Sequence, residues 1–199
     1  MTKYIKQVSD QKDTLYNNIL LLCRNTLFYT KFDLIDTFQN RIHLIFIHIS
    51  FIFIKIKQND KKKIYKNFYQ EMFDLIFNKI ELNMREIGFG DSTINKNMRY
   101  LIKTFYNILF SCEKYKEMNP NTKNIFFNKY LRLNNIKNTT NNKDIIEYFD
   151  KYEAFCFDLN PDSVLKGELK FNYKWALVMA VPKRKTSKSR RNKRRSHHR

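Results

Sequence analysis

Few of the residue patterns that carry out chemistry occur in this sequence. His43 and His48 are five positions apart, about 140° around a helix, so their imidazoles would not share one face or one metal ion. We interpret both as core or interface histidines. The chain has no GxSxG or HExxH sequence, and "GFG" at Gly88–Gly90 lacks the further glycine and the preceding strand of a dinucleotide-binding loop. The sequence therefore favours binding over catalysis.

The acidic residues at helix-like spacings are also explained without catalysis. Asp33 and Asp36 form a possible carboxylate pair, but "FDLID" precedes an expected helix, where acidic residues serve as caps. Glu81 and Arg85 are four residues apart, which is the spacing of an ion pair on a helix surface.

The cysteines indicate a reducing compartment. Cys23, Cys112 and Cys156 are scattered, and none belongs to a CxxC sequence or has a histidine at ligand spacing. They predict neither a disulfide framework nor a zinc site. The first residues, "MTKYIKQVSDQKD", lack the apolar core of a signal peptide. The expected location is a reduced cytosolic or matrix-like compartment.

Composition predicts a globular body with a basic tail. The chain has 199 residues, of which 43% are hydrophobic, enough for a buried core. Its formal net charge is +19, and ten of the basic residues lie between Lys183 and Arg199, where no acid occurs. Without these ten charges the net charge falls to +9. A segment this charged cannot build a core, so we expect a disordered basic C-terminal tail.

Apolar residues recur at helical spacing throughout the body, whereas no strand-like alternation occurs. The clearest pattern runs through Ile94, Met98, Leu101, Phe105, Ile108, Cys112 and Tyr115 in steps of 4 and 3. The first expected helix has its apolar face at Leu15, Ile19, Leu22 and Thr26. The third, over residues 61–87, has its apolar face at Ile64, Phe68, Met72, Leu75 and Leu82. The predicted fold is an all-α bundle of about five to six helices, which include residues 36–57, 61–87, 121–133 and 143–157. A polar loop is expected at 134–143, and Gly167 is expected to close a short helical turn.

The most apolar run is "LIFIHISFIFI", from Leu44 to Ile54. Its eleven residues fall short of the 20 or so that a membrane-spanning helix needs. We interpret the run as a buried central helix.

Two of the three glycines flank Phe89 in "NMREIGFGD", Asn83–Asp91. Gly88 lies where the third helix must end, at a position that favours a left-handed residue. Asp91 or Ser92 would then cap the fourth helix, and Phe89 would turn inward. The pattern predicts a tight corner between two helices.

This corner is also the most specific part of a family resemblance. The stretches "LYNNILLLCRNTLFYTKFDLIDTFQNRIHLIFIHISFIF" and "FYQEMFDLIFNKIELNMREIGFGDSTINKNMRYLIKTFYNILFSCEKY" resemble the ubiquinol-cytochrome c chaperone family, the assembly factors of the cytochrome bc1 complex. The resemblance spans residues 12–118 and continues weakly to "NPDSVLKGELKF", whereas 123–142 departs from the family pattern. The matching residues are Phe28, Tyr29, Asp36, Thr37, Arg41, His48, Phe73, Asp74, Arg85, Glu86, Gly88, Gly90, Asp91, Phe105 and Tyr106.

The resemblance implies an all-α domain with no enzymatic activity and no cofactor, which holds newly made cytochrome b during assembly of the complex. Other bc1 subunits and a second assembly factor are further partners that it implies. Its candidate partner-binding residues in this sequence are Arg85, Glu86, Gly88, Gly90, Asp91, Asp36, Arg41 and His48.

A second resemblance concerns the tail. "MAVPKRKTSKSRRNKRRSHHR", Met179–Arg199, is similar to the beginning of bacterial large-subunit ribosomal protein number thirty-two. Either neighbouring genes have been joined by a frameshift or a lost stop codon, or the fusion is genuine and tethers the chain near a ribosome. We therefore expect a chaperone-like domain at 1–171, a spacer at 172–178 and a tail at 179–199.

The tail suggests an alternative function as a ribosomal component that binds rRNA, and anionic membrane lipid is a competing partner for its charge. The candidate RNA-binding residues are Lys183, Arg184, Lys185, Lys188, Arg190, Arg191, Lys193, Arg194 and Arg195.

Overall fold

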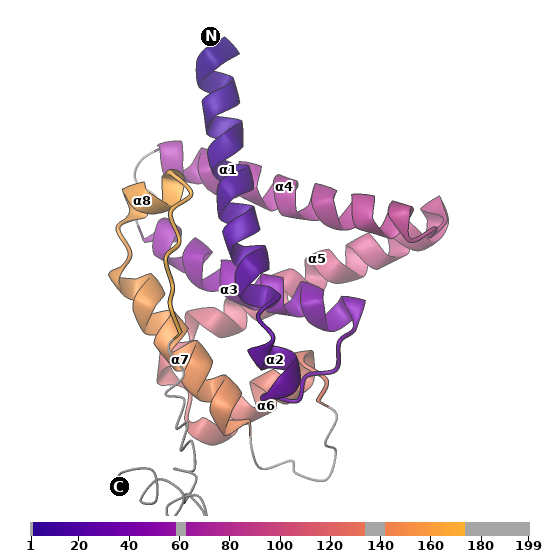
Figure 1. The fold of residues 1–199 in the computed structure, drawn as a ribbon, viewed down its shortest axis with the longest axis vertical. Coiled ribbons are helices and arrows are strands. Elements are labelled where there is room, and N and C mark those ends of the chain that lie inside the picture. Colours follow the sequence, from indigo (N-terminus) through magenta and orange to yellow (C-terminus); the bar gives the residue numbers. More distant parts are fainter. Residues whose placement is uncertain (1, 59–62, 134–141, 174–199) are drawn as a thin grey trace, which may run out of the picture.

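The computed structural model describes residues 2–58, 63–133 and 142–173, and these residues form a bundle of helices (Figure 1). The one pairing of strand type within the described part is an isolated antiparallel bridge between Leu34 and Leu133. The predicted all-α fold is therefore confirmed. The elements are α1 (Thr2–Cys23), α2 (Leu27–Thr30), α3 (Phe38–Lys57), α4 (Lys63–Glu86), α5 (Asp91–Glu113), η1 (Tyr115–Glu117), α6 (Pro120–Tyr130), α7 (Lys143–Asp158) and α8 (Pro161–Leu165).

Helix α3 is the centre of the bundle, and α1, α4, α5, α7 and α8 all pack against it. Its run from Leu44 to Phe53 is buried without interruption, which confirms the prediction of a buried central helix. Burial on all sides follows from its sequence, because it carries no charged side chain between Arg41 and Lys55. Within the described residues, no helix is both long and apolar enough to cross a membrane.

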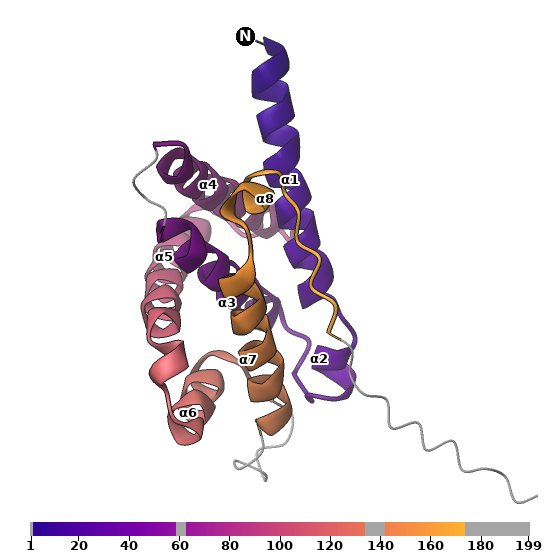
Figure 2. The same cartoon turned by 90° about the vertical axis from the view of Figure 1, so that its left-hand side faces the viewer.

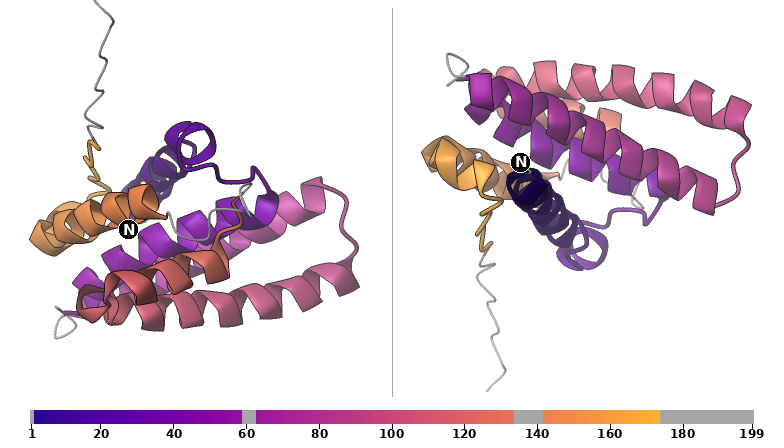
Figure 3. Two further views of the ribbon diagram at one scale, coloured as in Figure 1. Left: turned by 90° about the horizontal axis from the view of Figure 1, so that it is seen from below. Right: turned by 90° about the horizontal axis from the view of Figure 1, so that it is seen from above.

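Helices α4 and α5 lie side by side as a hairpin whose corner is at one end of the molecule (Figures 1 and 3). The predicted inner face of α5 is confirmed, since Ile94, Leu101, Phe105, Ile108 and Cys112 are buried. That face packs on α3, and Met98 packs partly against the same core.

The inner face of α4 differs in part from the prediction. Phe68 and Met72 are buried, but Ile64 and Leu82 are 53% and 54% exposed. Leu82 follows Met72 by ten residues, which places it about 80° away around the helix and on the solvent side. The buried stripe continues instead in steps of four through Ile76, Ile80 and Met84.

The N-terminal elements also depart from the predicted boundaries. Leu15 and Ile19 are buried as expected, but α1 already ends at Cys23. Thr26, predicted on the same face, is exposed and stands at the N-cap of the short helix α2, which the sequence pattern did not predict.

The C-terminal part of the body folds back along α1 (Figure 2). Gly167 ends α8 in a left-handed conformation with φ +79°, as predicted, and its carbonyl accepts a hydrogen bond from Asn18 of α1 at 3.0 Å. Phe171 and Tyr173 then contact the ring of Tyr148, with centroids 5.6 Å and 4.9 Å away. The packed body thus reaches Tyr173, two residues into the predicted spacer.

Two predicted segments fall outside the described residues. They are the polar loop, apart from its last residues Asn142 and Lys143, and the whole basic tail with its candidate RNA-binding residues.

Candidate partner-binding surface

The corner between α4 and α5 is built as the glycine spacing predicts. Gly88 has φ +95°, and its N–H donates to the carbonyl of Arg85 at 3.0 Å. The N–H of Phe89 reaches back to the carbonyl of Met84 at 3.1 Å. These two bonds form a Schellman motif, which satisfies carbonyls that the end of α4 would leave unpaired. The prediction that Gly88 ends this helix is confirmed.

The start of α5 differs from the prediction. Its N-cap residue is Gly90, with φ −72°, and no side chain caps the helix, so the proposed cap at Asp91 or Ser92 is wrong. Asp91 is instead the first residue of α5, where its negative charge lies at the positive end of the helix dipole. Its carboxylate accepts a hydrogen bond from Arg85 at 2.6 Å rather than from the backbone of its own helix.

Arg85 joins the two helices of the corner. Its Nη1 donates to Asp91, while its Nε and Nη2 donate to Oε1 of Glu81 at 3.1 Å and 2.8 Å. The predicted ion pair between Glu81 and Arg85 is therefore present. The hydrogen bonds that Arg85 donates to Glu81, and secondarily the one it donates to Asp91, raise the pKa of its guanidinium above the ordinary value. Arg85, Glu86, Gly88, Gly90 and Asp91 are all exposed, so the predicted corner residues form one accessible surface.

The second group of predicted residues lies where α3 begins. Arg41 holds Asp36 in a two-pronged ion pair, with Nε to Oδ1 at 2.6 Å and Nη2 to Oδ2 at 2.7 Å. The hydrogen bond from Arg41 lowers the pKa of the Asp36 carboxyl. Neither acidic residue of "FDLID" caps the helix, contrary to the prediction. Thr37 does so, because its Oγ1 accepts a hydrogen bond from the N–H of Asn40 at 3.2 Å.

Apolar side chains from α3, the corner and α5 meet around one cavity. A cavity of about 210 Å³ is lined by Phe38 of α3, by Met84 and Phe89 of the corner and by Tyr100 of α5. Phe89 is 41% exposed, so the prediction that it turns inward is wrong. The exposed fractions of Phe38, Ile87 and Tyr100 are 37%, 61% and 56%. We call Phe38, Ile87, Phe89 and Tyr100, with the ion pairs of Arg41 and Arg85 beside them, the corner face.

His48 is not part of this surface, contrary to the prediction. Its side chain is fully buried in α3. Its Nδ1 lies 2.7 Å from the carbonyl of Leu44, so Nδ1 carries the proton, and its Nε2 accepts from the hydroxyl of Tyr148 at 2.9 Å. Burial lowers the pKa of His48 to about 4, so the ring is neutral near pH 7. The residue connects α3 to α7 inside the core.

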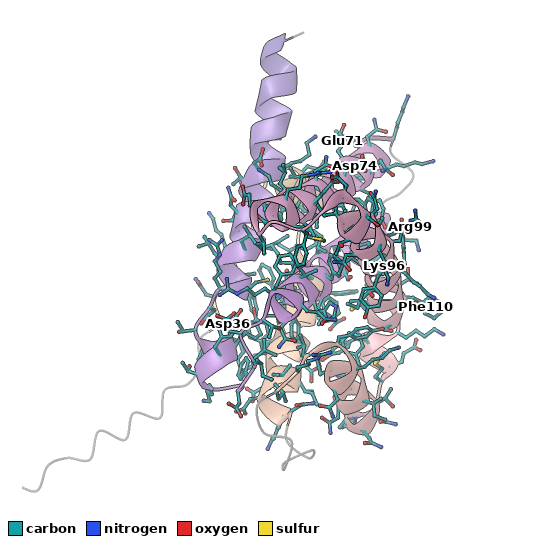
Figure 4. The ribbon with its side chains drawn as sticks, turned by 90° about the vertical axis from the view of Figure 1, so that its right-hand side faces the viewer. Asp36, Glu71, Asp74, Lys96, Arg99 and Phe110 are labelled. Carbon is teal, nitrogen blue, oxygen red and sulfur yellow. The ribbon has the colours of Figure 1, made fainter. Side chains whose placement is uncertain are left out.

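A larger groove lies away from the corner, between α3, α4 and the second half of α5. Its volume is about 760 Å³, and its lining includes Phe53, Tyr69, Tyr106, Leu109 and Phe110. Figure 4 shows Phe110 projecting from α5. Sequence reasoning missed this groove because residues of three separate helices form it. The one available signal was that Tyr106 and Phe110 lie four residues apart, off the predicted inner face.

The cysteines do not form a reactive site. All three are buried, unpaired thiols, and burial raises the pKa of each one. No cluster of potential metal ligands occurs among the described residues.

Comparison with known proteins finds two families that match parts of this chain. Residues 30–122 match the family model described as ubiquinol-cytochrome C chaperone, and residues 180–199 match the ribosomal L32p protein family. The first match is shorter than the predicted extent of 12–171, but it includes all the residues of the corner face. No curated protein sequence matches the chain.

A solved structure has the same fold. The crystal structure of the Cbp3 homolog from Brucella abortus superposes with a TM-score of 0.72 at 18% sequence identity, and the match covers 86% of this chain and 93% of that one. Residues 30–122, which hold α3, α4, the glycine corner and α5, are thus similar to the ubiquinol-cytochrome C chaperone family.

Proposed function

We propose that this protein is a non-enzymatic assembly chaperone of the cytochrome bc1 complex and that it holds newly made cytochrome b. The observation that carries the proposal is the family match over residues 30–122, whose most specific sequence forms an exposed corner. Apolar side chains of a client membrane protein need cover before assembly, and a helical surface with exposed aromatic residues provides it without nucleotide or cofactor.

The corner face is the surface that we assign to the client. Phe38, Ile87, Phe89 and Tyr100 offer apolar and aromatic contact area, which is typical of the centre of a protein interface. The Asp36–Arg41 and Arg85–Asp91 ion pairs lie beside it as a polar rim. Because each of these charges already has a partner, the face presents little net charge to an apolar segment.

Such a chaperone would work where cytochrome b is made, in the bacterial cytoplasm or the mitochondrial matrix. A peripheral contact with the membrane and a second assembly factor are compatible with this role.

Complementation of a deletion strain tests the proposal. We expect loss of the protein to lower the amount of assembled bc1 complex and the wild-type gene to restore it. A Phe38→Ser, Phe89→Ser double variant should restore much less, because it removes two aromatic contacts from the corner face. Assembled complex is measured by native gel electrophoresis and by the haem b absorbance of membranes.

The matched control is the Leu21→Ser, Ile125→Ser double variant. These side chains are 67% and 61% exposed, on α1 and α6, and neither lines the cavity of the corner face. It should restore assembly fully. Normal levels of complex in the deletion strain would contradict the proposed function, whereas equal rescue by both double variants would contradict the assignment of the face.

The match of residues 180–199 to the ribosomal L32p family supports a second candidate, a ribosomal component that binds rRNA through the tail. Sedimentation separates the two candidates. Co-migration with large ribosomal subunits after a high-salt wash would favour the ribosomal role, because attraction to phosphates alone is lost as salt rises.

A further inference from the structure

A polar cavity lies where α3, α5 and α6 meet, next to the corner face, with which it shares Tyr100. Its volume is about 300 Å³. It is lined by His43 of α3, Lys103 and Asn107 of α5, Lys129 of α6 and Arg132 just beyond α6. Figure 3 shows α6 lying beside α3 and α5 when the molecule is seen from below.

Positive charge converges on this cavity without compensation. Lys103 comes from α5, Lys129 and Arg132 come from the end of α6 and the residues just after it, and no aspartate or glutamate is among the lining residues. No salt bridge of these three side chains occurs within the described part of the chain. Three cations around one concave site produce a positive potential that attracts anions.

Arg132 is held in place by its backbone. Its N–H donates to Oδ1 of Asn40 at 3.0 Å, and its carbonyl accepts from Nδ2 of the same residue at 2.9 Å and from the N–H of Ile35 at 3.0 Å. Asn40 is 1% exposed, so these bonds fix the chain after α6 against the start of α3. The third cation of the cavity is thus positioned by the fold.

Two buried polar groups at the cavity have no hydrogen-bond partner in the part of the chain that the structure describes. His43 is 3% exposed, and its Nδ1 lies 2.6 Å from the carbonyl of Tyr130, so Nδ1 carries the proton of the neutral ring. Its Nε2 has no hydrogen-bond partner among the described residues, and neither has the buried hydroxyl of Tyr130. Unpaired buried polar groups are rare in folded proteins, because such groups normally bond to the protein, to water or to a bound ion. Both residues line the cavity, but these two atoms are covered, so a ligand there would reach them after a small shift of the His43 and Tyr130 side chains.

We propose that this cavity binds a phosphate group, with Lys103, Lys129 and Arg132 supplying the charge and protonated His43 donating a hydrogen bond from Nε2. A phosphate dianion accepts several charge-assisted hydrogen bonds at once, which matches three cationic side chains, an imidazole and a phenol around one space. The phosphate belongs either to a small soluble ester or to the headgroup of a phospholipid.

Binding is coupled to uptake of a proton. Burial, and secondarily the charge of Arg132, lower the pKa of His43, while its bond to Tyr130 opposes this. In the empty cavity the ring is therefore neutral near pH 7, and a bound dianion favours the protonated form. The other ionisable side chains that face the cavity are Tyr100 and Lys103 of α5, Lys129 and Tyr130 of α6, and Arg132. Of His43 and these five side chains, only the imidazole of His43 is of a type that ordinarily titrates between pH 5 and 8.

Isothermal titration calorimetry of the full chain tests the site. Sulfate is the first probe, because it stays a dianion from pH 5.5 to pH 8. The basic tail binds anions too, so we compare variants that all retain it. We expect the Lys103→Gln, Lys129→Gln double variant to bind sulfate about tenfold or more weakly than wild type. The Lys96→Gln, Lys170→Gln double variant loses the same charge from exposed positions outside the cavity and should bind as wild type does.

The pH dependence isolates His43. Wild type should bind sulfate about tenfold more tightly at pH 5.5 than at pH 7.5, and His43→Gln should lose most of that difference. Equal affinity of the wild type and the cavity double variant would overturn the proposal, as would binding of an acidic peptide without binding of sulfate or inorganic phosphate.

A second pair of probes identifies the source of the phosphate. Glycerol 3-phosphate represents soluble esters, and vesicles of phosphatidylglycerol in phosphatidylcholine represent lipid headgroups. Weaker binding of either probe to the cavity double variant than to the control variant supports the site and names its ligand. Equal binding of both probes to the two variants would contradict it.

Discussion

At the scale of single residues, the polar groups of the family pattern divide into those that stabilise the fold and those on its surface. His48 is a core residue whose two ring nitrogens are bonded to Leu44 and Tyr148. Arg85 is exposed and bridges Glu81 and Asp91. The family resemblance was drawn from both residues, yet only Arg85 is exposed.

The burial of His48 predicts a loss of stability in acid. The pKa of His48 is about 4 when folded and near 6.5 when unfolded, so the unfolded state binds more protons between these values. The contribution of neutral His48 to the free energy of unfolding is fully present above pH 6.5. About 3 kcal/mol of this free energy is lost as the pH falls to about 4. Urea denaturation at pH 7 and pH 4.5 measures it. The same comparison on His48→Gln should give a smaller difference, and an unchanged difference would contradict the assignment.

The left-handed conformation of Gly88 predicts the cost of adding a side chain there. Apart from the adjacent residues, no atom of the described part of the chain lies within 4 Å of a Cβ built on Gly88, so the penalty comes from the backbone alone. Gly88→Val should destabilise the protein by about 1 to 2 kcal/mol in thermal or urea unfolding. Gly90→Ser is the control, since Gly90 has φ −72° at an N-cap, where serine is favoured. Full stability of the valine variant would be inconsistent with the corner described here.

At the scale of elements, periodicity predicted the helices whose buried face is narrow and regular. The steps of 4 and 3 in α5 were sufficient to identify its core residues. The stripe of α4 was misassigned at Ile64 and Leu82, because the sequence offers apolar residues on two faces and only packing selects between them. The four residues of α2 are too few for a periodic signal.

A contact between elements also predicts a difference between two glycines. Gly88 and Gly167 both have positive φ, but a Cβ on Gly167 would lie 2.5 Å from the backbone oxygen of Gln11 in α1. Gly167→Ala should therefore destabilise the protein more than Gly88→Ala. Both substitutions strain the backbone, but only Gly167→Ala also pushes the segment after α8 away from α1. Urea unfolding of both variants measures the difference. Equal losses would show that this segment does not pack on α1 as described.

At the scale of the whole molecule, one buried helix supports surfaces on several sides. Helix α3 contacts α5 along the corner hairpin and α7 on another side, and its first turn contributes Phe38 to the corner face (Figure 1). Figure 4 places Asp36 at one edge of the molecule and Lys96, Arg99 and Phe110, on α5, at another. The cavity of the corner face and the groove beside Phe110 share no lining residue, so they are separate surfaces.

This arrangement explains how much of the candidate site the sequence predicted. The corner is local, so the glycines of "MREIGFGD" predicted the end of α4, and the spacing of Glu81 and Arg85 predicted their ion pair. The inward turn of Phe89 was wrong because nothing local shows that Phe38 and Tyr100 build an exposed face with it. The cavity around His43 requires residues from three segments, and no pattern within one of them indicates that they meet.

The central claim is that the corner face holds newly made cytochrome b. Its most direct test is site-specific photocrosslinking in cells that are synthesising cytochrome b, with the reactive side chain placed at Phe89 or, as a control, at Ile125 of α6. We expect a cytochrome b adduct from position 89 and none from position 125. Absence of the adduct at position 89, or equal adducts at both positions, would contradict the account.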